Sequence, residues 1–547
     1  MQGRCRALRA IPGCLVVFVA LLCHASPVSP AEAARWREDL HYFAKQAPQV
    51  HKNLFHSMTR GQFETAVQRL DGRLPTLSHN QIIVEIMRIV AMIGDGHTYV
   101  PTQESPTNFR HYPLKLYWFP DGVYVLQADA KYAAAVGGRV INLGKVSEQD
   151  AYAAVSKVVP HDNESQIKWM TPVYMSLAEV LDGLGLVNNL ERVPLTVEKD
   201  GKQTTIILTP EEGELSPHTF ALPEHWVDAR DPASPPPLWQ KDPANNYWFE
   251  YLGDSRTIYV QFNAVAQKLD ETIEMFIKRV MAFADTHPVD RFVFDERLNG
   301  GGNNYLLRPI IHAFIRSDTV NQPGKLFTII GRQTFSAAMN CVNRMKLNTN
   351  TLFVGEPTGS SPNQYGDNAP VVLPNSKLTV RLSTLWWQDM DPRDQRVWQA
   401  PDLSTELTFA DYRAGRDPAM EVILNYKPDL SIAELVSEAA KKNDYTGAKQ
   451  ALLKFTQDPL HKYSTAEAEI NRLGYEFIND KKFDQAILVL KLNVEAFPGS
   501  FNTWDSLAEA YMDRGDKELA IKNYSKSLEL NPNNSGARIQ LARLRAR

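Results

Sequence analysis

The sequence has few cysteines and no concentrated positive charge. Of its four cysteines, Cys5, Cys14 and Cys23 lie near the start, so a chain without its first 25 residues would keep only Cys341. One cysteine cannot form an internal disulfide, and such a chain must be held together by burial of apolar side chains. The net charge is −4 over 547 residues, and the body of the chain has no block of lysine and arginine. These features argue against a role in nucleic-acid binding.

The apolar run at residues 15–22 is too short for a membrane span, which needs about 20 residues. It follows three arginines, Arg4, Arg6 and Arg9, and precedes a small residue, Ala25. This pattern predicts a secretory signal peptide over residues 1–25. A lipoprotein signal is disfavoured because the bulky Leu22 precedes Cys23. We therefore expect an exported protein, periplasmic or extracellular, with no integral membrane span after signal cleavage.

Residues 31–98 predict a small helical domain. Apolar residues recur there at helical spacing, and a capping-box pattern, Ser78-x-x-Gln81, opens a third helix that runs to Ile93 before Gly94. Residues 105–210 instead contain short β-type runs, at 122–126, 138–142 and 194–197, with a helix-like stretch at 150–158.

Residues 211–247 are rich in proline, which predicts an extended linker or covering arm with no packed element. From 248 to 427, strand-like and helix-like segments alternate, which indicates a sheet built by crossover connections. Active groups of such sheets gather at the carboxyl ends of the strands.

The C-terminal region, residues 429–547, repeats itself. Seven positions have counterparts 34 residues earlier, and their residue types fit the tetratricopeptide repeat. They are Trp504, Leu507, Ala508, Tyr511, Ala520, Tyr524 and Pro532, which match Ile470, Leu473, Gly474, Phe477, Ala486, Leu490 and Pro498. A degenerate earlier copy is expected at 429–460.

Three short motifs could carry chemistry, although each has an ordinary structural interpretation. The glycines at 300–302, after an apolar strand, could aim amides at an oxyanion, or simply form a turn. Ser336, before a helix, could be a nucleophile, or only a helix N-cap. His97, in a Gly-Asp-Gly-His-Thr loop, could act as a general base. Neither His-x-x-x-His nor paired-cysteine spacing surrounds His97, so no metal is expected there.

The order of these motifs resembles the C-terminal-processing (tail-specific) peptidase family, including the tricorn core enzymes. The resemblance spans about residues 80–425. It implies a multidomain α/β protein with an N-terminal helical domain, a PDZ-like β-rich module, a crotonase-like (ClpP/crotonase) α/β catalytic domain and a C-terminal α-helical tetratricopeptide solenoid. It also implies that Ser336 is the nucleophile and that the amides of Gly301, Gly302 and Ala337 are oxyanion donors. No cofactor is called for.

The sequence departs from the family pattern at three places. Ser361 stands where the bacterial tail-specific branch has its lysine base, which leaves His97 as the base, as in the tricorn branch. That branch has a serine before the histidine, whereas this chain has Gly96. For the orienting acid, the resemblance points upstream of Pro401-Asp402, where we take Asp394 over Asp391.

The sequence therefore predicts a serine-type peptidase, of the endopeptidase kind, that cleaves peptides through Ser336 and His97. Its β-rich module would hold the substrate, and its repeat tail would recruit a protein partner. The rival hypothesis is a non-catalytic protein that binds a ligand or peptide on the same fold. The absent lysine and Gly96 favour this rival, whereas the joint presence of Ser336, His97 and the glycine row favours the enzyme.

Overall fold

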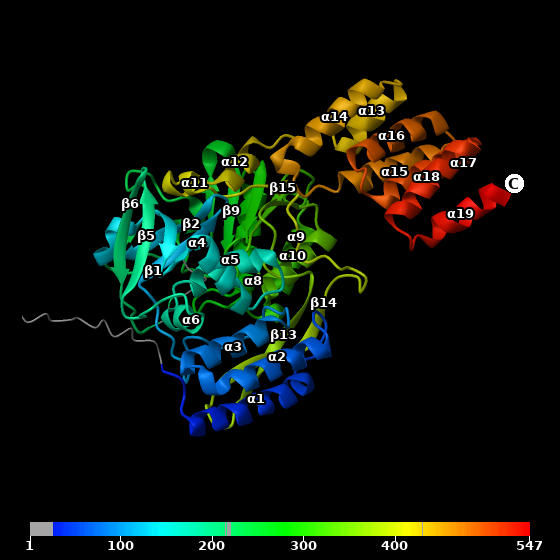
Figure 1. The fold of residues 1–547 in the computed structure, drawn as a ribbon. Coiled ribbons are helices and arrows are strands. Elements are labelled where there is room, and N and C mark those ends of the chain that lie inside the picture. Colours follow the sequence, from blue (N-terminus) through cyan, green and yellow to red (C-terminus); the bar gives the residue numbers. More distant parts are fainter. Residues whose placement is uncertain (1–25, 214, 216–219, 429, 547) are drawn as a thin grey trace, which may run out of the picture.

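The computed structural model describes residues 26–213, 215, 220–428 and 430–546. The predicted signal peptide, residues 1–25, lies outside the described residues. The chain forms a body with two sheets and a helical layer, from which the C-terminal helices extend as an arm (Figure 1). Within the described residues, no helix is both long and apolar enough to cross a bilayer.

Three helices form the N-terminal layer: α1 (Pro30–Val50), α2 (Arg60–Arg73) and α3 (His79–Ala91). The predicted capping box is confirmed, since the Ser78 hydroxyl accepts from the Gln81 amide and the Gln81 side chain accepts from the Ser78 amide. The helix then buries Ile82, Ile86 and Ile89 on its inner face. The chain leaves this layer through a loop that carries His97.

Seven strands form the first sheet, and three helices accompany it. The strands are β1 (Leu114–Phe119), β2 (Gly122–Asp129), β3 (Arg139–Leu143), β4 (Val146–Ser147), β5 (Val193–Lys199), β6 (Lys202–Leu208) and β7 (Trp226–Asp228). The helices are α4 (Glu148–Val155), α5 (Glu164–Tyr174) and α6 (Ala178–Gly183). The strand order is β1-β2-β3-β5-β6, with β4 paired to β3 and β7 to β2, and all pairs are antiparallel. This sheet and the helical layer share one continuous apolar core. The two units that the sequence separates therefore support each other.

The proline-rich segment is more ordered than predicted. Strand β7 pairs with β2, and a short helix, α7 (Leu238–Lys241), buries Trp239. Phe220 is also buried, and its ring packs edge-to-face on Trp239 with the ring centroids 5.0 Å apart. The expectation of an arm without packed elements is thus wrong, because large aromatic side chains interrupt the prolines and bury themselves against the body.

The second sheet has six strands. They are β8 (Tyr247–Leu252), β9 (Thr257–Phe262), β10 (Arg291–Asp295), β11 (Leu326–Ile330), β12 (Leu352–Gly355) and β15 (Leu403–Ser404). The order is β15-β12-β11-β10-β9-β8, parallel except for β8. Helices α8 (Ile273–Thr286), α9 (Arg308–Arg316) and α10 (Ala337–Asn348) pack on one face, and α12 (Pro418–Asn425) packs on the other, next to the short α11 (Phe409–Arg413). The predicted crossover sheet is confirmed.

A long hairpin joins the second sheet to the helical layer. Strands β13 (Asn363–Val372) and β14 (Thr379–Gln388) form a separate two-stranded sheet that reaches α1 (Figure 1). Asp39 on α1 accepts from the amides of Asn375 and Ser376 at the tip of the hairpin. The hairpin also pairs with the histidine loop, because Tyr99 and Arg381 exchange two backbone hydrogen bonds.

The C-terminal arm consists of antiparallel helices with their own core. They are α13 (Ile432–Lys441), α14 (Tyr445–Gln457), α15 (Ala466–Asn479), α16 (Phe483–Ala496), α17 (Phe501–Arg514), α18 (Lys517–Leu530) and α19 (Ser535–Ala546). Gly474 packs against Leu490, where a Cβ atom would lie 2.4 Å from the Leu490 side chain. The 34-residue period thus reflects paired helices that stack on their neighbours.

Candidate active site

Ser336 follows β11 and stands directly before α10. Its backbone has φ 58° and ψ −124°, a conformation that residues with a side chain rarely adopt. A serine on a strained turn from strand to helix presents its hydroxyl at the top of the sheet. The Ser336 amide donates to Ser360 Oγ at 3.0 Å, and its carbonyl accepts from Gln364 Nε2 at 3.0 Å. These contacts hold the turn, and the Ser336 residue itself is only half-buried.

The glycine loop packs against this turn from the neighbouring strand β10. Gly301 has φ +100°, and a Cβ atom there would lie 2.7 Å from Ser336 Cβ and 2.8 Å from the Ala337 nitrogen. Glycine is therefore required both by conformation and by space. However, the Gly301 amide already donates to Asn299 Oδ1 at 2.9 Å. The predicted donor at Gly301 is consequently not free in this structure.

Two other amides at the same turn are available. Within the described part of the chain, neither the Gly302 amide nor the Ala337 amide makes a hydrogen bond. Gly302 is exposed, with φ +135°, and Ala337 is the first residue of α10. The amides at a helix N-terminus favour negative charge.

Hydrogen bonds to Asp95 hold the loop that carries His97. Asp95 Oδ1 accepts from the His97 amide at 2.9 Å, and Asp95 Oδ2 accepts from Thr98 Oγ1 at 2.6 Å. Thr98 Oγ1 in turn accepts from the Ser383 amide of β14 at 3.1 Å. The Asp-Gly-His-Thr sequence thus builds a local turn and fastens it to the hairpin.

His97 and Ser336 meet although 239 positions separate them. His97 Nε2 lies 2.9 Å from Ser336 Oγ, and the imidazole stacks on Phe335 with ring centroids 4.4 Å apart. The stacking also explains Gly96. A Cβ atom at position 96 would lie 2.8 Å from Phe335 Cε2 and 2.5 Å from Gln166 Oε1. The serine of the tricorn pattern has no room here.

The surroundings of His97 favour its neutral form. Burial lowers the pKa of His97, and the negative charges of Asp95 and Asp367 offset only part of this effect. A neutral imidazole with Nε2 facing a hydroxyl can accept the hydroxyl proton. The Nδ1 atom is buried, and a hydrogen bond between the ring and the Tyr365 backbone opposes the lowering of the His97 pKa by burial.

The predicted contact between Asp394 and His97 is absent. The Asp394 carboxylate is held by Arg396, with Nη2 and Oδ2 2.6 Å apart, and Arg396 also reaches Gln399. Asp391 is likewise paired with an arginine, Arg393. Proximity to the Pro-Asp pair in the sequence misled the prediction, because the local Asp-x-Arg spacing satisfies both carboxylates within their own loop.

Three residues at the site were not predicted. Ser360 and Gln364 hold the turn that carries Ser336, and Asp162 accepts from the Gly96 amide at 2.7 Å. Ser360 lies in the stretch examined for a lysine, so its position was the one signal available. Gln364 and Asp162 lie in segments whose patterns show only strand and loop.

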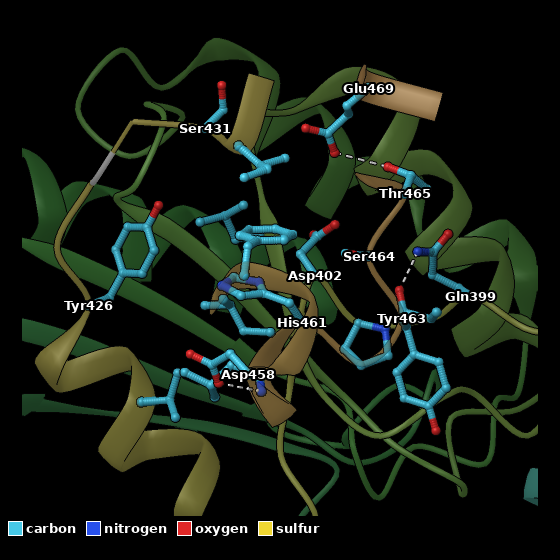
Figure 2. A pocket seen from close by; sticks show the side chains of 18 of the residues that line it. Gln399, Asp402, Tyr426, Ser431, Asp458, His461, Tyr463, Ser464, Thr465 and Glu469 are labelled. Carbon is cyan, nitrogen blue, oxygen red and sulfur yellow. Dashed lines mark hydrogen bonds between the residues drawn. The ribbon is translucent and has the colours of Figure 1, made fainter. Parts of the chain in front are cut away.

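A separate groove of about 1600 Å³ lies between the second sheet and the helical arm. Figure 2 shows Asp402, Tyr426, His461 and Glu469 around this hollow, and neither His97 nor Ser336 lines it. Among the residues that the structure describes, no three His, Cys, Asp or Glu side chains gather as a metal site would require.

Comparisons with known proteins identify the repeat in the C-terminal arm. A family model of the tetratricopeptide repeat matches residues 501–534. Superkiller complex protein 3 of Homo sapiens is 39% identical over 61 residues, which are 11% of this chain and 4% of that protein. The chloroplastic tetratricopeptide repeat domain-containing protein PYG7 of Arabidopsis thaliana is 28% identical over 141 residues, 25% of this chain and 42% of that protein. The chain thus spans less than half the length of these curated relatives.

Solved structures match the remainder of the chain. A mutant of CPAF has a TM-score of 0.51 at 12% identity, over 73% of this chain and 99% of that one. The photosystem II D1 C-terminal processing protease has a TM-score of 0.34 at 14% identity, over 72% and 99%. The tricorn protease also has 0.34, at 13% identity, over 72% and 36%. The match to the CPAF mutant shows that this chain shares its fold.

Proposed function

We propose that this chain is an exported serine-type peptidase, of the endopeptidase kind, with Ser336 as nucleophile and His97 as general base. The observation that carries the proposal is the 2.9 Å contact between His97 Nε2 and Ser336 Oγ. Covalent catalysis needs a nucleophile and a base within hydrogen-bond reach. The strained backbone of Ser336 is a further feature that is common at active sites. The fold shared with CPAF adds support.

The reaction begins when Ser336 Oγ attacks the carbonyl carbon of a peptide bond. His97 Nε2 takes the hydroxyl proton, and the carbonyl oxygen becomes an oxyanion. We assign its stabilisation to the free amides of Gly302 and Ala337, and we give Gly301 the role of leaving space for Ser336. His97 then returns the proton to the leaving amine, and water attacks the acyl-serine with His97 again as base.

Among the residues that the structure describes, no carboxylate is hydrogen-bonded to His97 Nδ1 as the orienting acid of an ordinary triad would be. In its place, we propose that the nearby negative charges of Asp95 and Asp367 stabilise the imidazolium that forms during proton transfer. Asp95 also fixes the backbone of His97 through its amide. The site then acts as a dyad in a negatively charged surrounding.

A non-catalytic binding protein is the second candidate. Two observations favour it: within the described residues no carboxylate hydrogen-bonds to His97 Nδ1, and Asn299 already engages the Gly301 amide. In that case the half-buried Ser336 would contact a peptide or another ligand without reacting.

A fluorophosphonate probe distinguishes the two functions. We expect the mature protein to become labelled at Ser336, and Ser336→Ala and His97→Ala each to abolish labelling. If the two groups act as a unit, the double variant loses little more than either single variant. An unlabelled wild-type protein, or labelling that survives Ser336→Ala, contradicts the peptidase and leaves the binding protein.

We assign further roles to the other parts of the chain, with the boundaries expected from the sequence. Residues 105–210, which supply strands β1 to β6 of the first sheet, are assigned as the PDZ-like module, and an extended substrate could add to the outer strand β6. The parallel sheet of 248–427 corresponds to the crotonase-like catalytic domain. The repeats at 429–547 would bind a protein partner on their concave face.

A further inference from the structure

The start of helix α5 contacts both the loop that carries His97 and the loop after β12 that leads to the Ser336 turn. Asn163, the N-cap of this helix, donates through Nδ2 to the Val397 carbonyl at 2.7 Å and to the Thr358 carbonyl at 3.1 Å. Ser165 Oγ donates to the Pro357 carbonyl at 2.7 Å. The helix start is therefore bound firmly to the loop that follows β12.

Asp162 precedes this N-cap and contacts both halves of the site. Its Oδ1 accepts from the Gly96 amide at 2.7 Å, and its Oδ2 accepts from the Ser361 amide at 3.3 Å. Gly96 is the residue directly before His97. One carboxylate thus spans the histidine loop and the loop after β12.

The loop after β12 leads on to the nucleophile. Ser360 Oγ accepts from the Ser336 amide at 3.0 Å, so the Ser360 hydroxyl proton remains free to be donated elsewhere. Asp162 is the acceptor within its reach, as the influence of this hydroxyl on the Asp162 carboxylate shows. The chain of contacts runs from Gly96 through Asp162 and Ser360 to Ser336.

We propose that Asp162 is a positioning residue that joins the His97 loop to the Ser336 turn, and that it does so only as a carboxylate. This inference rests on the proposed peptidase function. A carboxylate can accept from the two amides and the hydroxyl together, whereas an amide group turns an N–H toward one of these donors and a protonated carboxyl accepts fewer and weaker hydrogen bonds. The misplacement that follows would separate His97 from Ser336.

The charge state of Asp162 is sensitive to pH near neutrality. Burial raises its pKa to about 7, and the negative charge of Asp95 adds to this rise. Hydrogen bonds from Gly96, Ser361 and Ser360 oppose it. Asp95 itself contacts His51 and lies beside His97. Activity that needs ionised Asp162 should therefore rise with pH through about 7.

The test measures the rate of fluorophosphonate labelling of the full chain between pH 5.5 and 9, a range that extends to both sides of the Asp162 pKa of about 7. Asp162→Asn should lower the rate about tenfold or more at alkaline pH, because a small misplacement of reacting groups is costly. The pH at which the labelling rate falls on the acid side should move down from about 7 in this variant. Only His97, whose pKa is lowered by burial, then titrates there, so the acid limb of the profile follows His97. Asp200→Asn is the control, since Asp200 is exposed in the β5–β6 turn at φ 51°, which asparagine accepts.

Ser360→Ala provides a second variant that leaves Asp162 in place. It removes a hydrogen bond that lowers the pKa of Asp162, so its acid limb should move up, opposite to that of Asp162→Asn. The labelling rate of the double variant should be little lower than that of the slower single variant. Both changes remove the same interaction, between Asp162 and Ser360. If Asp162→Asn fails to fold, the upward shift in Ser360→Ala still tests the proposal.

Two outcomes overturn the inference. Labelling of Asp162→Asn at the wild-type rate and with the wild-type pH profile contradicts it. It is also contradicted if the losses of labelling rate in Asp162→Asn and Ser360→Ala are fully additive and their acid limbs do not move in opposite directions. A wild-type protein that never labels is a different result, because it contradicts the proposed peptidase before Asp162 is tested.

Discussion

Two histidines, His51 and His97, lie on either side of the Asp95 carboxylate and are held very differently. His51 is buried, and its Nδ1 accepts from the Asn53 amide at 3.0 Å. Its neutral ring must then carry the proton on Nε2, which lies 3.1 Å from Asp95 Oδ2. Both ring nitrogens of His51 are thus satisfied by fixed partners.

His97 Nε2 faces the Ser336 hydroxyl, and the other hydrogen-bond partner of the ring is the Tyr365 backbone. The negative charge of the nearby Asp95 stabilises the imidazolium that forms when Nε2 takes a proton. Burial raises the free energy of the charged imidazole, which keeps the ring neutral until a proton is offered. The two rings therefore differ in what faces Nε2: a carboxylate oxygen in His51 and the Ser336 hydroxyl in His97.

The largest expected effect comes from His97→Phe. Phenylalanine retains the stacking on Phe335 but cannot accept the Ser336 proton, so the labelling rate should fall by about 10³-fold or more. The melting temperature should change little, because no other side chain depends on this ring for a hydrogen bond within the described residues. Labelling kinetics and thermal unfolding measure the two effects, and a rate within tenfold of wild type would remove His97 from the mechanism.

Gly301→Ala should produce the next largest effect. The added methyl group would lie 2.7 Å from Ser336 Cβ, so the nucleophile turn must shift, and we expect about a 10²-fold slower labelling reaction. Gly185→Ala is the matched control, because Gly185 also has positive φ (+68°) but nothing within 4 Å. Equal labelling losses in both variants would mean that backbone strain, and not contact with Ser336, is responsible.

The smallest effect on reactivity is expected for His51→Phe. This change keeps an aromatic ring near His56 and Tyr365 but removes the group that faces buried Asp95, which should cost about 1–3 kcal/mol of unfolding free energy. Labelling should stay within about threefold of wild type, because the His97 amide and Thr98 still hold Asp95. Denaturant unfolding measures the loss, with exposed His56→Phe as control. A large loss of labelling without a loss of stability would mean that His51 takes part in the reaction.

Local patterns predicted the elements of the fold well. The capping box at Ser78 starts a helix because its reciprocal hydrogen bonds need only four consecutive residues. The 34-residue period predicts stacked helical pairs because each pair buries its apolar face on the next. The proline-rich segment was misjudged because burial of Phe220 and Trp239 depends on surfaces far away in the sequence.

The candidate site could be predicted only in part. Glycine rows and a serine before a helix are visible in the sequence, because strand ends of a parallel sheet meet at one edge. The use of the Gly301 amide by Asn299 depends on loop geometry that spacing does not encode. Asp394 was selected by sequence distance to Pro401, whereas its partner is Arg396, two residues away.

The amino-acid sequence alone specified the local elements and the repeat and singled out Ser336 and His97 as candidates, since these follow from short-range periodicity and residue chemistry. Packing of the whole chain decided which groups meet. The β13–β14 hairpin and the shared apolar core carry His97 to Ser336, and the start of α5 brings Asp162 between their loops. Such contacts join residues far apart in the chain, and their geometry depends on how extended surfaces fit together, which no short stretch of sequence contains.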